Sequence, residues 1–261
     1  MNLRSAIAVV AIGLLPASAG AHPHYLFGQI GSAPVLLKLE RNADKLSGWY
    51  LYLRVAKEIR VDGGVDAKGA FRLEEFDNDS GHKTGSFSGT VKSDSWSGIW
   101  RRPDGSSALA FSARETADTL AGMSDALQCR AKKVDTQFGW TFTQDLKLKV
   151  VRGQVKQFDH ELTAKSLSGD EHGCLIGAKY LQQQKSDAGI LLHAKETGDV
   201  SGLHCSVRII ANADWLEVEM GDPSGSNDDC KGAGDTMFCS PSAGWADLVV
   251  NRKSRTCRIE E

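Results

Sequence analysis

A regular series of short β-type segments between residues 25 and 113 limits the folds open to this chain. Glycine, aspartate and asparagine, which tolerate positive φ in tight turns, separate the segments. Strands at even spacing joined by such turns predict an antiparallel meander that closes as a barrel or sandwich. The expected strands are Tyr25–Ile30, Val35–Glu40, Leu46–Leu53, Lys57–Val61, Ala70–Phe76, Gly85–Lys92, Trp96–Trp100 and Ala108–Ala113.

Several of these segments indicate how the meander is built. Leu46–Leu53 is apolar or aromatic on both faces, which is typical of a central strand or barrel wall. Ser-Gly recurs before a β-forming residue at positions 47, 88 and 97, and glycine inside a strand makes room for a bend. We interpret the strand aromatics as core residues, with a ligand cleft as the alternative. They are Trp49, Tyr50, Tyr52, Trp96 and Trp100.

The pattern changes over residues 114–128. Leu120, Met123 and Leu127 recur at helical spacing after a possible cap at Thr116. We therefore predict a helical linker over 114–128, between a cysteine-free meander domain at 22–113 and a second β-rich domain at 129–261. Residues 174–184 fit a helix nearly as well as a strand. The strands expected in the second domain are Gly139–Thr143, Lys147–Val151, Phe158–Thr163, Gly189–Ala194, Cys205–Ala211, Trp215–Met220 and Leu248–Asn251.

Residues 1–21 have the three-part layout of a cleaved secretory signal peptide. Arg4 precedes an uncharged apolar run, and small residues follow it up to Ala21. The run is too short for a membrane-spanning helix, so we expect no membrane anchor. We predict a periplasmic or secreted protein that begins at Gly20 or His22 after cleavage.

All six cysteines lie in the second domain, at Cys129, Cys174, Cys205, Cys230, Cys239 and Cys257. In an exported chain an even set of cysteines predicts disulfides, here three. The preferred pairing is Cys129–Cys174, Cys205–Cys257 and Cys230–Cys239. Other connectivities, and free buried thiols, remain alternatives.

Charge excludes some partners. Residues 22–128 carry 13 Lys+Arg against 14 Asp+Glu, and residues 129–261 carry 17 against 19. Neither part is basic, so nucleic acid and anionic membranes are poor candidates.

Catalytic motifs recognisable over a short stretch are absent from the sequence. It has no nucleophile elbow, zinc-protease helix, phosphate loop or dinucleotide fingerprint. His160 stands between Asp159 and Glu161, and His172 follows two acidic residues. A neighbouring carboxylate could orient a general base, but adjacent residues in a strand point to opposite faces. We therefore interpret these histidines as solvated polar positions.

Metal sites are also disfavoured, and no cofactor is expected. The loop from Gly221 to Asp235 is rich in aspartate, but its spacing does not match a regular calcium loop. Cleavage before Gly20 would create a Gly-Ala-His terminus able to bind Cu(II) or Ni(II), which we interpret as adventitious.

The expected function is that of a non-catalytic exported binding protein, for example an inhibitor or immunity-type partner of another envelope or secreted protein. A loop held by Cys230 and Cys239 loses less entropy on docking, so the predicted contact surface centres on residues 221–239, which we call the acidic loop. Its binding residues are Asp222, Asp228, Asp229 and Asp235. The alternatives are a hydrolase of envelope polymers, with Asp159, His160, Glu161 or the aromatic strands at its cleft, and a carrier of a small ligand or metal inside the barrel.

Overall fold

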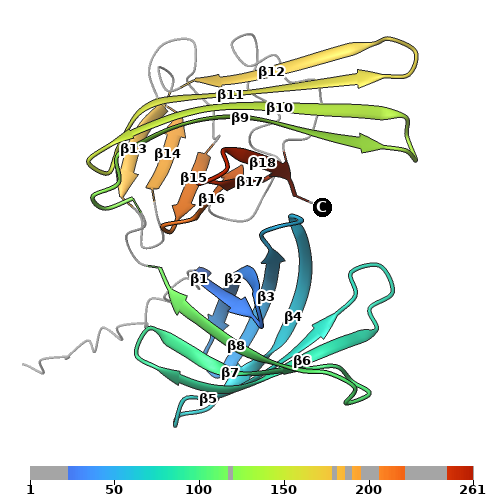
Figure 1. Cartoon of the computed structure of the whole chain (residues 1–261), viewed down its shortest axis with the longest axis vertical. Coiled ribbons are helices and arrows are strands. Elements are labelled where there is room, and N and C mark those ends of the chain that lie inside the picture. The colour runs from blue at the N-terminus through green and yellow to red at the C-terminus, as the bar shows by residue number, and fades with distance from the viewer. Residues whose placement is uncertain are drawn as a thin grey trace, which may run out of the picture.

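The computed structural model describes residues 23–116, 120–177, 181–185, 190–194, 206–220 and 246–260. These residues form only strands and their connections, arranged as a closed barrel and two further antiparallel sheets (Figure 1). The predicted fold class, a meander domain followed by a disulfide-linked β-rich domain, is confirmed.

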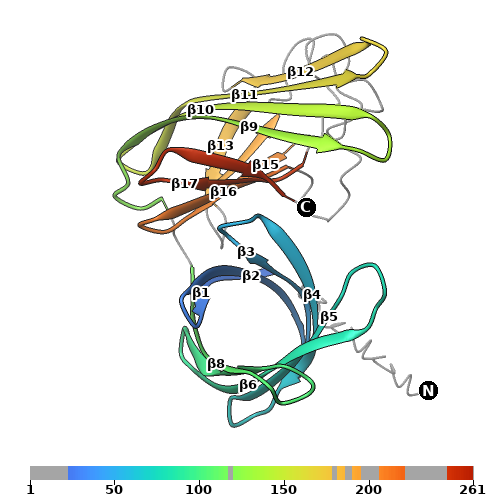
Figure 2. The same cartoon turned by 45° about the vertical axis from the view of Figure 1, so that its right-hand side comes forward.

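The barrel contains eight antiparallel strands in sequence order, and β1 closes it by pairing with β8 (Figure 2). All eight segments expected before residue 114 are present, with small changes at their ends. The strands are β1 (Pro23–Ile30), β2 (Ala33–Asn42), β3 (Lys45–Tyr52), β4 (Lys57–Val65), β5 (Ala70–Phe76), β6 (Lys83–Lys92), β7 (Ser95–Arg101) and β8 (Ala108–Glu115).

Side chains pack the interior of the barrel. Phe87 lies edge-on to Tyr50 and to Phe111, with ring centroids 5.4 and 5.1 Å apart, and Phe71 contacts both Phe111 and Trp96. These rings come from five different strands, so they join opposite walls. The core interpretation is confirmed for Tyr50, Trp96 and Trp100, which are buried. Trp49 is 37% exposed on the outer wall, and Tyr52 is half-buried.

The repeated Ser-Gly pairs mark points where neighbouring strands approach too closely for a side chain. A Cβ atom at Gly48 would lie 2.0 Å from the Lys38 carbonyl oxygen, and one at Gly98 would lie 2.2 Å from the Ser88 carbonyl oxygen. Gly48 also has a φ of 150°, which L-residues rarely adopt. These glycines let the wall curve tightly enough to close.

The second unit is a sandwich of two sheets. The four-stranded sheet has the order β12-β11-β10-β9 and the six-stranded sheet has the order β13 to β18. The first contains β9 (Asp125–Asp135), β10 (Trp140–Val151), β11 (Gln154–Ser166) and β12 (Glu171–Gly177). The second contains β13 (Leu181–Lys185), β14 (Ile190–Ala194), β15 (Ser206–Ala211), β16 (Trp215–Met220), β17 (Leu248–Asn251) and β18 (Thr256–Ile259).

The alternating pattern of each strand decides which side chains fill the space between these sheets. Leu146, Leu148 and Phe158 from the first sheet and Val207 and Leu216 from the second belong to one apolar cluster. The segments expected at 139–143 and 147–151 are parts of the single strand β10. Residues 174–184, which had no clear assignment, contain the end of β12 and the start of β13.

The predicted helix at 114–128 is wrong for the residues that the structure describes there. Strand β8 extends to Glu115, a turn follows at Leu120–Gly122, and β9 begins at Asp125. Leu120 and Met123 close the turn through a 2.9 Å main-chain hydrogen bond, and both are buried with Leu127 in the sandwich core. A turn leading into a strand therefore produced the same spacing of apolar residues as a helix.

The disulfide pairing expected for Cys129 and Cys257 is also wrong. The two residues form a disulfide with each other, which joins β9 to β18 across the sandwich, with Cα atoms 5.8 Å apart. They are 128 positions apart in the sequence, so local spacing held no information about their meeting. The predicted Cys129–Cys174 and Cys205–Cys257 bridges are therefore excluded. Cys205, Cys230 and Cys239 lie outside the described residues.

The outer wall of the barrel packs on the six-stranded sheet. Leu36, Leu51 and Leu53 from the barrel form a buried apolar cluster with Ile210 and Val249 from the sheet. Strand β3 is apolar on both faces because one face lines the barrel interior and the other covers this sheet. The six-stranded sheet is likewise covered on both faces, by the barrel and by the four-stranded sheet (Figure 1).

Candidate functional site

A buried lysine surrounded by carboxylates lies beside the apolar contact between barrel and sandwich. Lys38 is on β2, where Leu37 and Leu39 point into the barrel and Lys38 points out toward the sandwich. On β16, Leu216 and Val218 face the sandwich core, so the intervening Glu217 faces the barrel. The period of two along each strand therefore places a cation and an anion opposite each other.

The Lys38 ammonium lies within ion-pair distance of five carboxylates, which together we call the Lys38 cluster. Only Glu58 comes from the barrel, and the other four come from the sandwich. The distances from Lys38 Nζ are 2.8 Å to Glu217, 3.3 Å to Asp247, 3.6 Å to Glu260, 3.8 Å to Glu219 and 3.9 Å to Glu58.

Burial is uneven within the Lys38 cluster. The Glu217 side chain is fully buried, Lys38 and Glu260 are about nine-tenths buried, and Asp247 and Glu219 retain 21% and 27% exposure. Asp247 also accepts a hydrogen bond from the Met220 main-chain N–H at 2.8 Å. No described residue donates a hydrogen bond to Oε2 of Glu217. The cluster therefore contains a carboxylate whose main compensation is one ammonium group.

Desolvation dominates the electrostatics of these acids. Burial, together with the neighbouring carboxylates, raises the pKa of Glu217 to about 7, although Lys38 opposes the shift. The same cause raises the pKa of Asp247 to about 6 and that of Glu260 to about 10. For Lys38, burial lowers the pKa, but the surrounding carboxylates outweigh it and hold the pKa well above the ordinary value.

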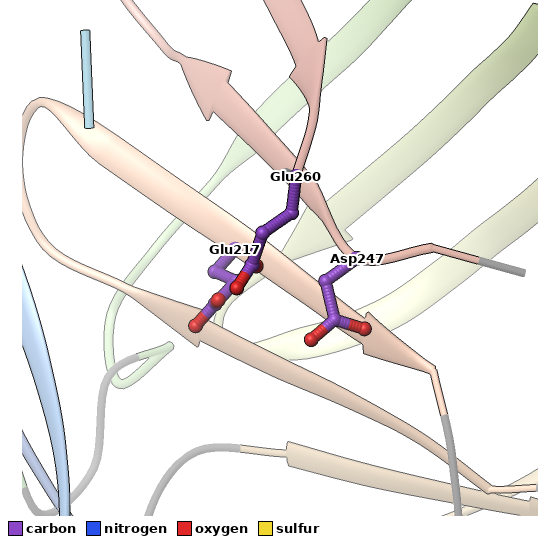
Figure 3. Close-up of side chains that lie close together, drawn as sticks. All are labelled: Glu217, Asp247 and Glu260. Atoms are coloured by element: carbon purple, nitrogen blue, oxygen red, sulfur yellow. The ribbon is translucent and has the colours of Figure 1, made fainter. Parts of the chain in front are cut away.

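The side chains of Glu217, Asp247 and Glu260 lie close together (Figure 3), and each presents a carboxylate oxygen within 4.8 Å of the others. Such a triad of oxygens could hold a hard cation. Lys38 Nζ, however, already lies 2.8 to 3.6 Å from all three side chains. We therefore interpret the lysine ammonium as the cation of this group.

A hydrogen-bonded network borders the Lys38 cluster on its β1 side. The Tyr25 hydroxyl donates to Glu219 at 2.6 Å, and Arg208 lies 3.5 Å from the same carboxylate oxygen and over the Tyr25 ring. Burial raises the pKa of Tyr25 far above its usual range, so this hydroxyl remains a donor. The network links the barrel to β15 and β16 by polar contacts as well as by apolar packing.

A groove of about 630 Å³ lies at another part of the same junction, lined by Phe27, Arg114, Met123 and Arg252 among others. Its most buried charge is already engaged, because Arg252 pairs with Asp125 at 3.2 Å and donates to the Asn212 carbonyl oxygen. We interpret these contacts as structural.

The structure corrects the interpretation of His160 as a solvated residue. His160 is fully buried on the inner face of β11, and its Nε2 atom donates to Gln144 at 2.7 Å. Gln144 in turn donates to the Ala246 carbonyl oxygen. Burial lowers the pKa of His160 to about 3, so the ring is neutral at ordinary pH.

The strand geometry also separates His160 from its sequence neighbours. Asp159 and Glu161 lie on the opposite, outer face of β11, as the alternation of a strand requires. The three residues of the alternative hydrolase site therefore do not meet. Sequence reasoning missed the burial of His160 because charged neighbours on both sides suggested a polar strand.

A second feature that sequence reasoning missed is an exposed apolar tip on the four-stranded sheet. The β9–β10 and β11–β12 turns lie side by side at one end of the sheet (Figure 1), and the Leu167 N–H donates to the Gly139 carbonyl oxygen at 3.1 Å. Phe138 is 70% exposed and Leu167 is 92% exposed, and Val134 lies nearby on β9 with 57% exposure. These three residues define the apolar tip.

The predicted binding residues Asp222, Asp228, Asp229 and Asp235 lie outside the described residues, as do the signal segment and Gly20 to His22. The structure therefore leaves these expectations as predictions. No helix among the described residues is long and apolar enough to cross a membrane. No protein-family model, curated protein or solved structure matches the chain.

Proposed function

We propose that this chain is a non-catalytic, exported binding protein that engages another protein through the apolar tip of its four-stranded sheet. The observation that carries the proposal is the exposure of Phe138 and Leu167 on two turns that are joined by a main-chain hydrogen bond. Large apolar side chains gathered at an exposed site are typical of interaction surfaces. Aromatic and aliphatic anchors of this kind contribute much of the free energy of protein association.

The turns that carry the tip are held in place by their own side chains. Asp135 accepts hydrogen bonds from the main-chain N–H groups of Gln137 and Phe138 at 2.9 and 3.0 Å. In the other turn, the Asp170 N–H donates to the Ser166 hydroxyl at 3.0 Å. The Leu167 side chain lies against Gly139, and a Cβ atom added to Gly139 would come within 2.8 Å of Leu167 Cδ1. A preorganised surface loses less conformational entropy on binding.

The shape of the tip favours a partner with a concave surface. The two turns end a pair of long hairpins that project from the body of the sandwich (Figure 1). A convex apolar tip fits a cleft better than a flat surface, and clefts are where enzymes bind their substrates. This geometry supports the inhibitor-type role among the binding functions considered above.

The barrel is a less favourable place for a ligand. Aromatic rings from five strands contact one another inside it, and Glu75 there accepts hydrogen bonds from Tyr50, Trp100 and Thr84. A carrier would need this packed interior to open. The filled barrel therefore supports a binding role at the surface over transport of a ligand inside.

The test compares the wild-type mature chain with a Phe138→Ser/Leu167→Ser variant and a Val55→Ser control. Val55 is 56% exposed on the barrel, so its replacement removes an exposed apolar side chain away from the tip. Each chain is immobilised and exposed to exported proteins from the source organism, and the affinity for any captured protein is then measured with purified components.

The tip variant should lose at least about tenfold in affinity, because anchor residues each contribute more than about 1–2 kcal/mol, while the control keeps its affinity. Equal binding by the tip variant would refute the tip as the contact surface. Turnover of an envelope polymer by the purified wild-type chain would refute the non-catalytic role itself.

A further inference from the structure

The junction between barrel and sandwich contains more acids than bases. Five carboxylates face it, against the ammonium of Lys38 on β2 and the guanidinium of Arg208 on β15. The Tyr25 hydroxyl on β1 also faces it, and the Lys133 ammonium on β9 donates to the Glu260 main-chain oxygen at 3.2 Å. The carboxylates are Glu58 on β4, Glu217 and Glu219 on β16, Asp247 before β17 and Glu260 after β18.

We propose that the Lys38 cluster is a proton-dependent latch, in which docking of the barrel on the six-stranded sheet takes up protons, so that the contact weakens as the pH rises. The latch concerns the contact between the two units and does not depend on the proposed binding function.

Geometry gives the first reason. Glu217, Asp247 and Glu260 present oxygens within 4.8 Å of one another, all on the sandwich side of the contact. Three like charges at this separation repel strongly when the barrel covers them and excludes water. Lys38 brings one positive charge to them. A carboxylate that remains unneutralised must either gain a proton or return to water.

The separated units have no such constraint. If the barrel moved away, water would solvate the sandwich carboxylates, and Lys38 would keep Glu58 as its barrel neighbour. The acids would then regain ordinary acidity and release protons. The docked state thus binds more protons than the undocked state, and linkage makes docking depend on pH.

The pKa directions give the sign and the pH range. Burial raises the pKa of Glu217 to about 7, that of Asp247 to about 6 and that of Glu260 to about 10. A group whose pKa is raised in the docked state contributes fully below its ordinary pKa, and its contribution falls as the pH passes through the raised value. The contact should therefore be strongest near the ordinary carboxyl pKa of about 4, and it should weaken as the pH rises from there through the raised values.

Hydrogen exchange of the full mature chain, corrected for intrinsic rates, tests the latch between pH 5.5 and 9. Peptides from β2 and β16 report the junction, and peptides from β5 and β6, on the far side of the barrel, report the barrel itself. Wild-type protection at β2 and β16 should fall at least about tenfold between pH 6 and 9, because one pKa unit corresponds to a tenfold change in an equilibrium constant. Protection at β5 and β6 should change little.

Glu217→Gln/Glu260→Gln is the matching variant, since an amide has the shape of the protonated acid and cannot ionise. It should remove most of the pH dependence, whereas Glu161→Gln, on the exposed outer face of β11, should leave it unchanged.

If the double variant does not fold, Glu260→Gln alone should still reduce the dependence. Protection that is independent of pH in the wild type, or an equal fall in Glu217→Gln/Glu260→Gln, would overturn the proposal. Restoration of protection at pH 9 by added calcium would overturn it as well, because the cluster would then be a cation site.

Discussion

The barrel and the junction each bury a glutamate, and they compensate it in different ways. In the barrel, Oε2 of Glu75 accepts hydrogen bonds from Tyr50 at 2.7 Å and Trp100 at 2.6 Å, and Oε1 accepts one from Thr84 at 2.8 Å. At the junction, Glu217 lies 2.8 Å from Lys38, and no described residue donates a hydrogen bond to its Oε2.

The two glutamates differ in whether their partners belong to the same structural unit. All three donors to Glu75 belong to the barrel, so the barrel satisfies its own buried charge. Lys38 and Glu217 belong to different units and meet only when the barrel is docked. A charge that depends on a partner across an interface makes that interface sensitive to pH and to loss of the partner. The barrel network should therefore act as a rigid part of the core, and the junction as a conditional contact.

Lys38→Met should give the largest loss of stability among single changes. It retains the bulk of the side chain but leaves Glu217 and its neighbours buried without their main cation. Breaking one partner of a buried ion pair costs about 3–5 kcal/mol. Urea unfolding at pH 7 and 9 measures the effect, which should be larger at pH 9 because the pKa of Glu217 is about 7.

Lys165→Met, which removes an exposed lysine, is the control. A loss below about 1 kcal/mol, the value of an exposed pair, would show that the cluster does not hold the junction.

The next largest effect should come from the disulfide, which belongs to the sandwich alone. Replacing Cys129 and Cys257 together by alanine should cost about 2–4 kcal/mol, because the cross-link restricts the unfolded chain. Limited proteolysis should then cut the sandwich first and leave a protected barrel fragment. Simultaneous cutting of both units would instead show that the apolar contact of Leu36, Leu51 and Leu53 with the sandwich couples their unfolding.

Glu75→Leu tests the barrel side of the comparison. The substitution leaves the donors on Tyr50, Trp100 and Thr84 without their shared acceptor, and unsatisfied buried groups cost about 1–3 kcal/mol. Glu75→Gln should cost less, because the amide oxygen still accepts. The midpoint of urea unfolding, followed by tryptophan fluorescence, provides the measurement. A leucine variant as stable as the wild type would mean that the network contributes nothing to the barrel.

The smallest effect on stability should follow from changes in the acidic loop. The polar sequence of this loop predicts exposed positions, so replacing Asp222, Asp228, Asp229 and Asp235 by serine should alter the free energy of unfolding by less than about 0.5 kcal/mol per residue. If the loop contacts a basic partner, association should become slower and less dependent on salt. With a partner in hand, unchanged association kinetics would refute the loop as a contact and leave the apolar tip as the candidate surface.

The sequence by itself determined the strands of the barrel and the fold class. Alternation of apolar side chains and the turn residues between them act over a few positions, so each strand could be located from its own residues. The glycines of the Ser-Gly repeats could be interpreted in the same way, because Gly48 and Gly98 lie where neighbouring backbones crowd. The same local reasoning failed at Leu120, Met123 and Leu127, where a turn and a strand imitate the spacing of a helix.

The tertiary structure alone decided the candidate sites. Lys38 and Glu217 are separated by 179 positions, and Cys129 and Cys257 by 128. Local sequence spacing therefore could not predict either contact. His160 has charged neighbours in sequence and yet lies in the core, because its strand presents alternate residues to opposite faces. The apolar tip likewise exists only because pairing of β10 with β11 brings two distant turns together. The alternation along a strand determines on which face of the sheet a side chain lies. Only the packing of whole sheets determines which residues that face contacts.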